Sequence, residues 1–342
     1  MLKFIKVSAF IFCIFYQTVS AQDPQFSQFY AAPLYLNPAF AGSSGLARVG
    51  LNYRNQWPSL NANFVTYSAY FDYFFEDYNS GVGLLLTSDR EGLVGLQSHS
   101  AAFQYAYQLR LTDNITFRPG VHVAAVTKNI NFNNLVFESQ INPITGYDPN
   151  LGSGEGGFND NVFYVDLGLG GLFYSDNFWI GGSVHHLTEP NEAFSDENIA
   201  ALPMKISIHG GYRIPISSAN NTYAFGSLRD ISITPTAQYK AQGEFDQLDL
   251  GMYFTYEPLV LGLWYRGLPF KELNNISNNE SVIVLVGLTK GNLNIGYSFD
   301  YTISQLGIAS GGAHELSLRY EFFLGDPRKP AKNVRKIPCP SF

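Results

Sequence analysis

The chain has 342 residues, a net charge of −7, and only 14% charged side chains against 15% aromatic ones. Soluble domains carry about 25% charged residues, so this composition argues against an ordinary soluble domain. The acidic balance argues against a nucleic-acid-binding protein, and we expect no nucleic-acid partner. After the first 21 residues no stretch approaches the roughly 18 to 20 apolar residues of a membrane helix. A chain of this kind that spans a bilayer would do so as a closed β-barrel.

Residues 1–21 have the features of a secretory signal peptide. Lys3 and Lys6 precede an apolar run, and Ala21 ends a small-residue cleavage site. Cys13 follows large apolar residues rather than a small one, so we expect no lipid anchor. The mature chain is predicted to begin near Gln22.

Residues 22–44 are too aromatic to remain in water and too rich in proline for a regular strand. A wide barrel has a lumen unless something fills it. We therefore expect this segment to fold into or under the barrel as a plug. The residues best suited to fill the lumen are Phe26, Phe29, Tyr30, Leu34, Tyr35, Asn37 and Pro38.

Residues 45–324 alternate apolar and polar side chains with a period of two. In the last such segment Leu316, Leu318 and Tyr320 share one face, and Glu315 and Arg319 share the other. The pattern predicts an all-β fold, a transmembrane antiparallel β-barrel of about 14 strands. The strands are expected near residues 45–54, 61–75, 80–88, 95–110, 114–128, 162–174, 178–188, 203–214, 230–240, 245–256, 259–267, 281–289, 292–300 and 313–323.

Two predicted strands, 80–88 and 281–289, are apolar on both faces. Lipid accounts for one of these faces. The other face requires burial against the plug or against a partner.

The connections between strands differ in length on the two sides of the predicted barrel, as they do in outer-membrane barrels. One side has short turns, with 215–229 as a long exception. The other side has long polar connections over 129–161, 188–202, 268–280 and 301–312. An even number of strands places both ends of the barrel, and hence both termini, on the same side, the periplasm of a Gram-negative cell.

Several charged residues fall on rows that alternation turns inward. Charges at membrane depth must pair or meet water. Either an ion-pair network braces the lumen or a polar path crosses it. The candidates are Arg48, Arg110, Arg118, Glu315, Arg319 and Glu321, with Arg54 and Asp166 on similar rows.

The sequence contains no recognisable catalytic motif, cofactor motif or metal motif. His185 and His186 are adjacent, and His122 faces inward in an earlier strand. Neighbouring strand residues point to opposite faces, so His185 and His186 are not expected to chelate one metal ion together. We interpret these histidines as polar residues of the lumen or interface, and we expect no catalytic residue, cofactor or metal.

Residues 325–342 form a basic, proline-rich end with five Lys or Arg residues against Asp326. This composition predicts an extended, solvated periplasmic tail. Cys339 is the one cysteine left after signal removal, so no intramolecular disulfide is possible. Its thiol either forms a mixed disulfide or stays buried and inert.

The chain resembles the PorP/SprF family of Bacteroidetes outer-membrane proteins. The resemblance rests on QDPQFSQFY and PLYLNPAFAG near the mature start, on NYRNQWP at 52–58, on GAHELSLRYEF at 312–322, and on the late Cys339. It implies a non-enzymatic role in type IX secretion and gliding motility. The implied partners are a secreted surface adhesin bearing a type IX C-terminal domain, a periplasmic OmpA-type peptidoglycan-binding protein, and outer-membrane lipid.

Two further expectations depend on this resemblance. The family motif at Arg54, Asn55, Gln56 and Trp57 falls at the first outward-facing turn, which makes these residues candidates for contact with the cargo. Asn37-Pro38-Ala39 also resembles the fatty-acid transporter (FadL-like) barrels. The alternative function is therefore a channel for small hydrophobic molecules.

Overall fold

The computed structural model describes residues 23–92, 95–130, 132, 135–142, 146–148, 159–195, 199–217, 223–224, 227–228, 231–273, 276–304, 307–324 and 337–340. The predicted signal peptide and residues 325–336 of the predicted tail lie outside these ranges. None of the helices in the described ranges has the length and hydropathy that a bilayer crossing demands.

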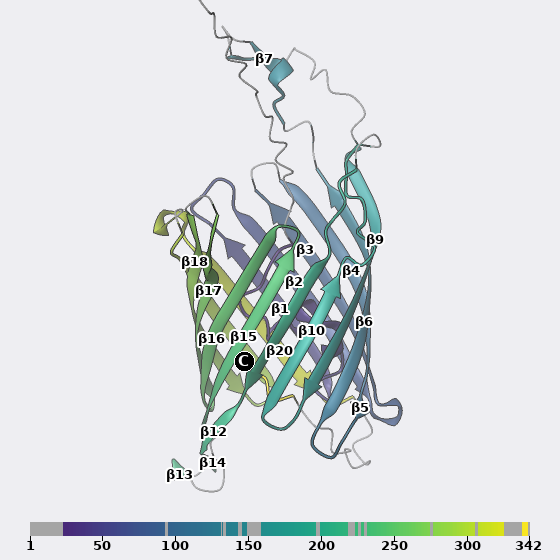
Figure 1. Ribbon diagram of the computed structural model, residues 1–342, viewed down its shortest axis with the longest axis vertical. Coiled ribbons are helices and arrows are strands. Elements are labelled where there is room, and N and C mark those ends of the chain that lie inside the picture. The colour runs from purple at the N-terminus through teal and green to yellow at the C-terminus, as the bar shows by residue number, and fades with distance from the viewer. Residues whose placement is uncertain are drawn as a thin grey trace, which may run out of the picture.

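Fourteen antiparallel strands close into a barrel, as the alternation predicted (Figure 1). The ring closes because β1 pairs with β20 and β11 pairs with β15. At two places in the ring a strand is interrupted and continues as a second, short strand. β4 continues as β5, and β11 continues as β12. In chain order the wall comprises β1 (Ala47–Gln56), β2 (Phe64–Phe75), β3 (Ser80–Glu91), β4 (Leu96–Tyr107), β5 (Leu109–Arg110), β6 (Thr116–Asn129), β9 (Asn161–Tyr174), β10 (Phe178–His185), β11 (Lys205–Tyr212), β12 (Ile214–Ser217), β15 (Ile231–Gln242), β16 (Phe245–Tyr256), β17 (Leu259–Leu273), β18 (Ile276–Lys290), β19 (Leu293–Thr302) and β20 (Ala313–Phe322).

The exposed surface of the wall is apolar and the enclosed surface is polar. In β20, Leu316 and Tyr320 are 50% and 45% exposed, whereas Glu315 and Ser317 are 1% and 2% exposed. Water would favour the reverse arrangement, and hydrocarbon favours this one. The strands therefore present a lipid-facing row and a lumen-facing row, as predicted.

The two ends of the barrel differ. We call the end at Phe75 and Ser80 the turn rim, and the end at Asn129 and Asn161 the loop rim. On the turn rim β2 and β3 are joined through η2 (Glu76–Tyr78). On the loop rim the β6–β9 connection contains η4 (Glu138–Gln140) and a hairpin of β7 (Ile141–Asn142) and β8 (Gly146–Tyr147), and Figure 1 shows β7 well beyond the wall.

Two predicted connections contain strands instead. Residues 268–280 are not a long loop, because β17 and β18 continue pairing up to Leu273 and Ile276. The long exception at 215–229 contains the end of β12 and a small hairpin of β13 (Tyr223–Ala224) and β14 (Ser227–Leu228). The β19–β20 connection contains a short helix, η5 (Ile308–Ser310).

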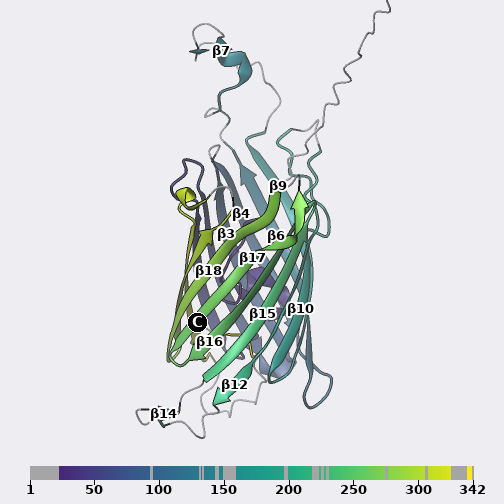
Figure 2. The same cartoon turned by 60° about the vertical axis from the view of Figure 1, so that its left-hand side comes forward.

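The segment before β1 lies within the barrel, where Figures 1 and 2 show it in purple behind the wall. It forms two short helices, α1 (Pro33–Leu36) and η1 (Pro38–Phe40), each with proline at its start. Proline suits this position because the first helical N–H has no partner in the helix. The Asn37 side chain caps η1 by accepting a hydrogen bond from the Ala39 N–H at 2.9 Å.

The internal segment runs from the loop rim to the turn rim. Asp23 contacts His186 and Lys205 at the loop-rim ends of β10 and β11. Phe322, the last residue of β20, lies at the turn rim because it pairs with Ala47. Both ends of the barrel wall, Ala47 and Phe322, lie at the turn rim, as an even number of strands predicts, whereas the first described residue lies at the loop rim. The chain crosses the lumen once before β1 begins, and the strand count does not register that crossing.

Part of the predicted solvated tail is packed inside the molecule. Ile337 and Cys339 pack against the buried aromatic cluster of the lumen, and Pro340 is buried. The prediction of a solvated tail is wrong for residues 337–340. The reason is that Ile337 and Cys339 supply an apolar end after the basic run.

Candidate functional site

The interior of the barrel is the candidate site, and its core is aromatic. Phe29 meets the Trp264 ring of β17 at 4.7 Å between centroids, and Tyr30 meets Trp179 of β10 at 5.5 Å. The Trp179 indole donates a hydrogen bond to the Tyr30 hydroxyl at 3.0 Å. These edge-to-face contacts are the favourable geometry for aromatic pairs. The predicted lumen-filling residues are all buried here apart from Tyr35, which is partly buried: Phe26, Phe29, Tyr30, Leu34, Asn37 and Pro38.

This packing explains the strands that are apolar on both faces. Leu85 of β3 and Ile283 and Leu285 of β18 point inward and are buried in the same cluster as Phe29 and Leu34. Their neighbours in the strands face outward and are exposed. One face thus meets the expected lipid and the other meets the internal segment.

Wall glycines allow the backbone of the internal segment to touch the wall. A Cβ on Gly120 of β6 would lie 2.5 Å from the Ala39 nitrogen, which is closer than real Cβ atoms approach. A Cβ on Gly81 of β3 would overlap the Ala41 carbonyl, and one on Gly170 of β9 would overlap the Asn37 side chain. Only glycine accommodates η1 at this distance.

Wall side chains satisfy the carbonyl groups of the internal segment. Gln104 donates to the Leu34 carbonyl at 2.7 Å, and Ser183 donates to the Leu36 carbonyl at 2.9 Å. Arg118 donates to the carbonyls of Ala39 and Ala41. Buried backbone groups need such partners, so the wall and the segment form one hydrogen-bonded unit.

Buried ion pairs hold the part of the internal segment that lies near the loop rim. Arg54 pairs with Asp300 at 2.9 Å and with Glu315 at 3.2 Å. Arg266 pairs with Asp249 at 2.7 Å and with Asp300 at 3.1 Å. All five side chains are almost completely buried, so their mutual pairing is what makes their burial tolerable.

Ser27 of the internal segment lies at the centre of this network. Its hydroxyl donates to Asp300 at 2.6 Å and accepts from Arg54 at 2.8 Å and from Arg266 at 3.0 Å. The Glu315 carboxylate accepts the backbone N–H groups of Ser27 and Gln28 at 2.7 and 2.9 Å. The ion network and the internal segment therefore depend on each other.

The predicted lumen charges are distributed as follows. Arg48, Arg118, Glu315 and Arg319 are buried in the lumen, and Glu321 is partly buried, 3.6 Å from Arg319. Arg110 is exposed in β5 at the turn rim, so it is not one of the buried lumen charges. Sequence reasoning missed three buried members, although alternation along their strands turns them inward: Asp72, Asp249 and Arg266. Alternation also predicts an inward position for Asp300, and Asp300 is buried.

The predicted cargo-contact residues separate into two groups. Arg54 is 2% exposed and is engaged in the ion network, so its side chain does not reach the surface. Asn55, Gln56 and Trp57 are partly exposed at the loop rim. Trp57 has a positive φ of 56°, its N–H donates to the Gly312 carbonyl at 2.7 Å, and its ring packs on Phe64.

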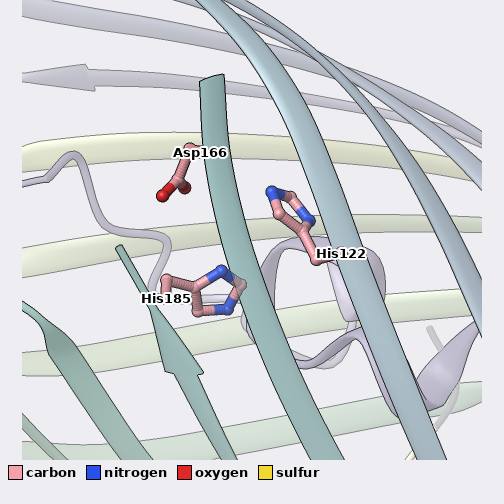
Figure 3. Close-up of side chains that lie close together, drawn as sticks. All are labelled: His122, Asp166 and His185. Atoms are coloured by element: carbon pink, nitrogen blue, oxygen red, sulfur yellow. The ribbon is translucent and has the colours of Figure 1, made fainter. Parts of the chain in front are cut away.

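His122 of β6, His185 at the end of β10 and His186 just after it gather near Asp166 of β9, and Figure 3 shows His122 and His185 converging with Asp166. His185 and His186 do not face opposite ways, because a φ of 57° at His186 ends the strand geometry and both side chains are buried. Burial alone would lower the pKa of His186, but Asp23 and Asp166 outweigh it and raise the pKa to about 9.

The chain matches the family model for the type IX secretion system membrane protein PorP/SprF over residues 18–320. No curated protein matches the chain.

Solved structures similar to this chain are outer-membrane barrels. The P. putida toluene transporter TodX has 11% identity and a TM-score of 0.45, covering 84% of this chain and 93% of that chain. A TodX deltaS2S3 mutant monoaromatic hydrocarbon channel has 12% identity and a TM-score of 0.47, covering 84% and 92%. The Acinetobacter baumannii outer membrane protein Omp33 has 10% identity and a TM-score of 0.41, covering 81% and 98%. The family model covers most of the sequence, and the protein belongs to the PorP/SprF family of type IX secretion system membrane proteins.

Proposed function

We propose that this protein is a non-enzymatic component of the type IX secretion machinery in the outer membrane, with the internal segment as a resident plug. The observation that carries the proposal is the continuous packing of residues 26–42 against the barrel wall, together with the family membership. A filled barrel is suited to binding a partner at its rim rather than to passing a protein through its lumen.

The loop rim is the proposed docking surface for an exported surface adhesin. It carries the longest connections of the barrel, including the β7–β8 hairpin that projects beyond the wall. Extended loops on a rigid scaffold are the usual location of binding residues. Asn55, Gln56 and Trp57 lie on this rim, and they remain the candidates of the family motif for contact with the adhesin's C-terminal domain.

The turn rim is the proposed periplasmic side. The barrel ends there at Phe322, and the basic residues of 325–336 follow. A periplasmic peptidoglycan-binding protein of OmpA type would meet the molecule at this rim. The turns here are short apart from the β12–β15 connection, so that connection is the main surface available to such a partner.

Deletion and complementation test this function. In a strain lacking the gene, we expect the adhesin to disappear from the cell surface and the full-length gene to restore it. Replacing Asn55, Gln56 and Trp57 together with alanine should reduce the restored display, while the same treatment of exposed turn-rim residues Asp77, Tyr78 and Asn79 should not. Unchanged display in the deletion strain would contradict the proposal.

The alternative function, a channel for small hydrophobic molecules, receives less support from the interior. Leu34, Ala39 and Phe40 occupy the centre of the lumen with 0–1% exposure, so the described residues leave no wide passage there. Uptake of a labelled monoaromatic hydrocarbon that depends on the gene would favour the channel instead.

A further inference from the structure

We infer that His122, Asp166 and His185 form a binding site for a divalent transition-metal ion of the zinc class. Each side chain offers one ligand atom, and these atoms lie within 4.8 Å of one another (Figure 3). The residues come from three adjacent strands, β6, β9 and β10, so an ion would join three parts of the wall.

The ligands are of the type and number that zinc takes at sites with an open position. Imidazole nitrogen and carboxylate oxygen bind Zn²⁺ at about 2.0–2.2 Å, which places tetrahedral ligands about 3.4 Å apart. Side-chain rotations that move the ligand atoms by about 1 Å would bring His122, Asp166 and His185 to that spacing. The same ligands suit Co²⁺ and Ni²⁺, which provide spectroscopic probes.

Buried polar atoms without hydrogen-bond partners also point to a ligand at this cluster. His185 and Asp166 are 7% and 4% exposed, yet Nε2 of His185 and Oδ1 of Asp166 have no hydrogen-bond partner. Buried polar atoms normally have partners, so two orphans in one cluster indicate a missing ligand. The other Asp166 oxygen lies 3.1 Å from His186, which would fix the orientation of the carboxylate.

The surroundings contain slightly more acidic than basic side chains. The cluster borders an internal cavity of about 100 Å³ that would admit water to a fourth coordination position. Its charged lining comprises four carboxylates against two lysines and one further histidine: Asp23, Asp89, Glu91, Asp166, Lys128, Lys205 and His186.

Gln104 connects the site to the internal segment. Its amide nitrogen lies 2.9 Å from Nδ1 of His122 and 2.7 Å from the Leu34 carbonyl, while its oxygen Oε1 is buried without a partner. In this arrangement the Gln104 amide donates to Nδ1, so the proton of the neutral His122 ring lies on Nε2. An ion bound at Nε2 would require that proton to move to Nδ1 and the Gln104 amide to turn, so that the partnerless Oε1 accepts it.

The test uses full-length protein without a histidine tag, purified in detergent and stripped with a chelator. Co²⁺ is titrated while visible absorption is followed, and Zn²⁺ binding is measured by calorimetry. We expect one ion per chain, with visible bands of nitrogen and oxygen coordination that Zn²⁺ abolishes. His122→Ala and His185→Ala should each weaken binding by more than about tenfold.

His314→Ala is the matched control, because His314 lies on the outward face of β20 and contacts Tyr297. It should bind Co²⁺ like the unchanged protein. Each variant is first checked for a folded barrel by its mobility in SDS before and after heating. Asp166→Asn, which keeps the shape of the side chain, replaces any variant that fails this check. Absence of binding to the unchanged protein, or equal binding by folded His122→Ala or Asp166→Asn protein, would overturn the inference.

Discussion

Asp72 of β2 binds Arg48 of β1 through both carboxylate oxygens, at 2.8 Å each, and one of these oxygens also accepts the Gly42 N–H at 2.7 Å. Arg48 in turn donates to the Phe40 carbonyl at 3.3 Å. The wall and the turn-rim end of the internal segment are thus joined through one buried ion pair. Asp72 itself is completely buried.

Asp72→Asn should destabilise the folded protein strongly. Removing one partner of a buried pair leaves an uncompensated charge on Arg48 and costs about 3–5 kcal/mol. Unfolding in urea, followed by heat-dependent gel mobility, measures the effect. The control Asp77→Asn changes an exposed acid of η2 and should have little effect.

A second substitution, at Arg48, should restore part of the stability that Asp72→Asn removes. In the double variant Asp72→Asn, Arg48→Gln the unpaired buried charge is gone, so the protein should be more stable than with Asp72→Asn alone. A double variant as unstable as the sum of the single variants would show that the two residues act independently.

Gly170→Ala should loosen η1. Its new methyl group would overlap Asn37, which caps that helix and donates to the Gly182 carbonyl at 3.0 Å. Hydrogen exchange of peptides covering residues 33–41 should become faster. Gly182→Ala is the matched control, since a Cβ there would lie 3.5 Å from the nearest atom, an ordinary contact. Equal exchange in both variants would mean that the wall does not press on η1.

The thiol of Cys339 should report whether residues 337–340 are docked. Burial raises the pKa of Cys339 to about 11, so the folded protein holds a neutral thiol at pH 8. Alkylation by iodoacetamide should be slow in the native state and fast after heating in SDS, because the thiolate is the reactive form.

The same shift sets a pH dependence for docking. The folded state holds the proton more tightly than the unfolded chain, so the thiol's contribution to docking is complete below about pH 9 and is lost as the pH rises towards the folded pKa of about 11. Alkylation that is as fast in native as in denatured protein at pH 8 would show that the segment is not docked.

The sequence predicted the barrel well because lipid and lumen impose a period of two on every wall strand. The predicted 245–256 strand coincides with β16, and most others differ by a few residues. Residues 268–280 were misassigned because their Asn and Ser content resembles a loop, whereas hydrogen bonding across the β17–β18 hairpin continues the ladder.

The interior was only partly predictable. The aromatic content of residues 22–44 pointed to burial, but the route from loop rim to turn rim depends on wall glycines such as Gly120, whose role no periodicity reveals. The approach of His185 to His122 depends on the ring order of β6, β9 and β10, and the burial of His186 depends on one positive φ. These are long-range or single-residue features that a strand pattern does not encode.

The central claim is that the internal segment closes the lumen, and single-channel conductance in planar bilayers tests it most directly. Purified full-length protein should insert without steady ion-conducting steps, whereas a variant lacking residues 26–42 should show open, porin-like steps. Steady open steps from the unchanged protein, equal to those of the deletion variant, would contradict the claim.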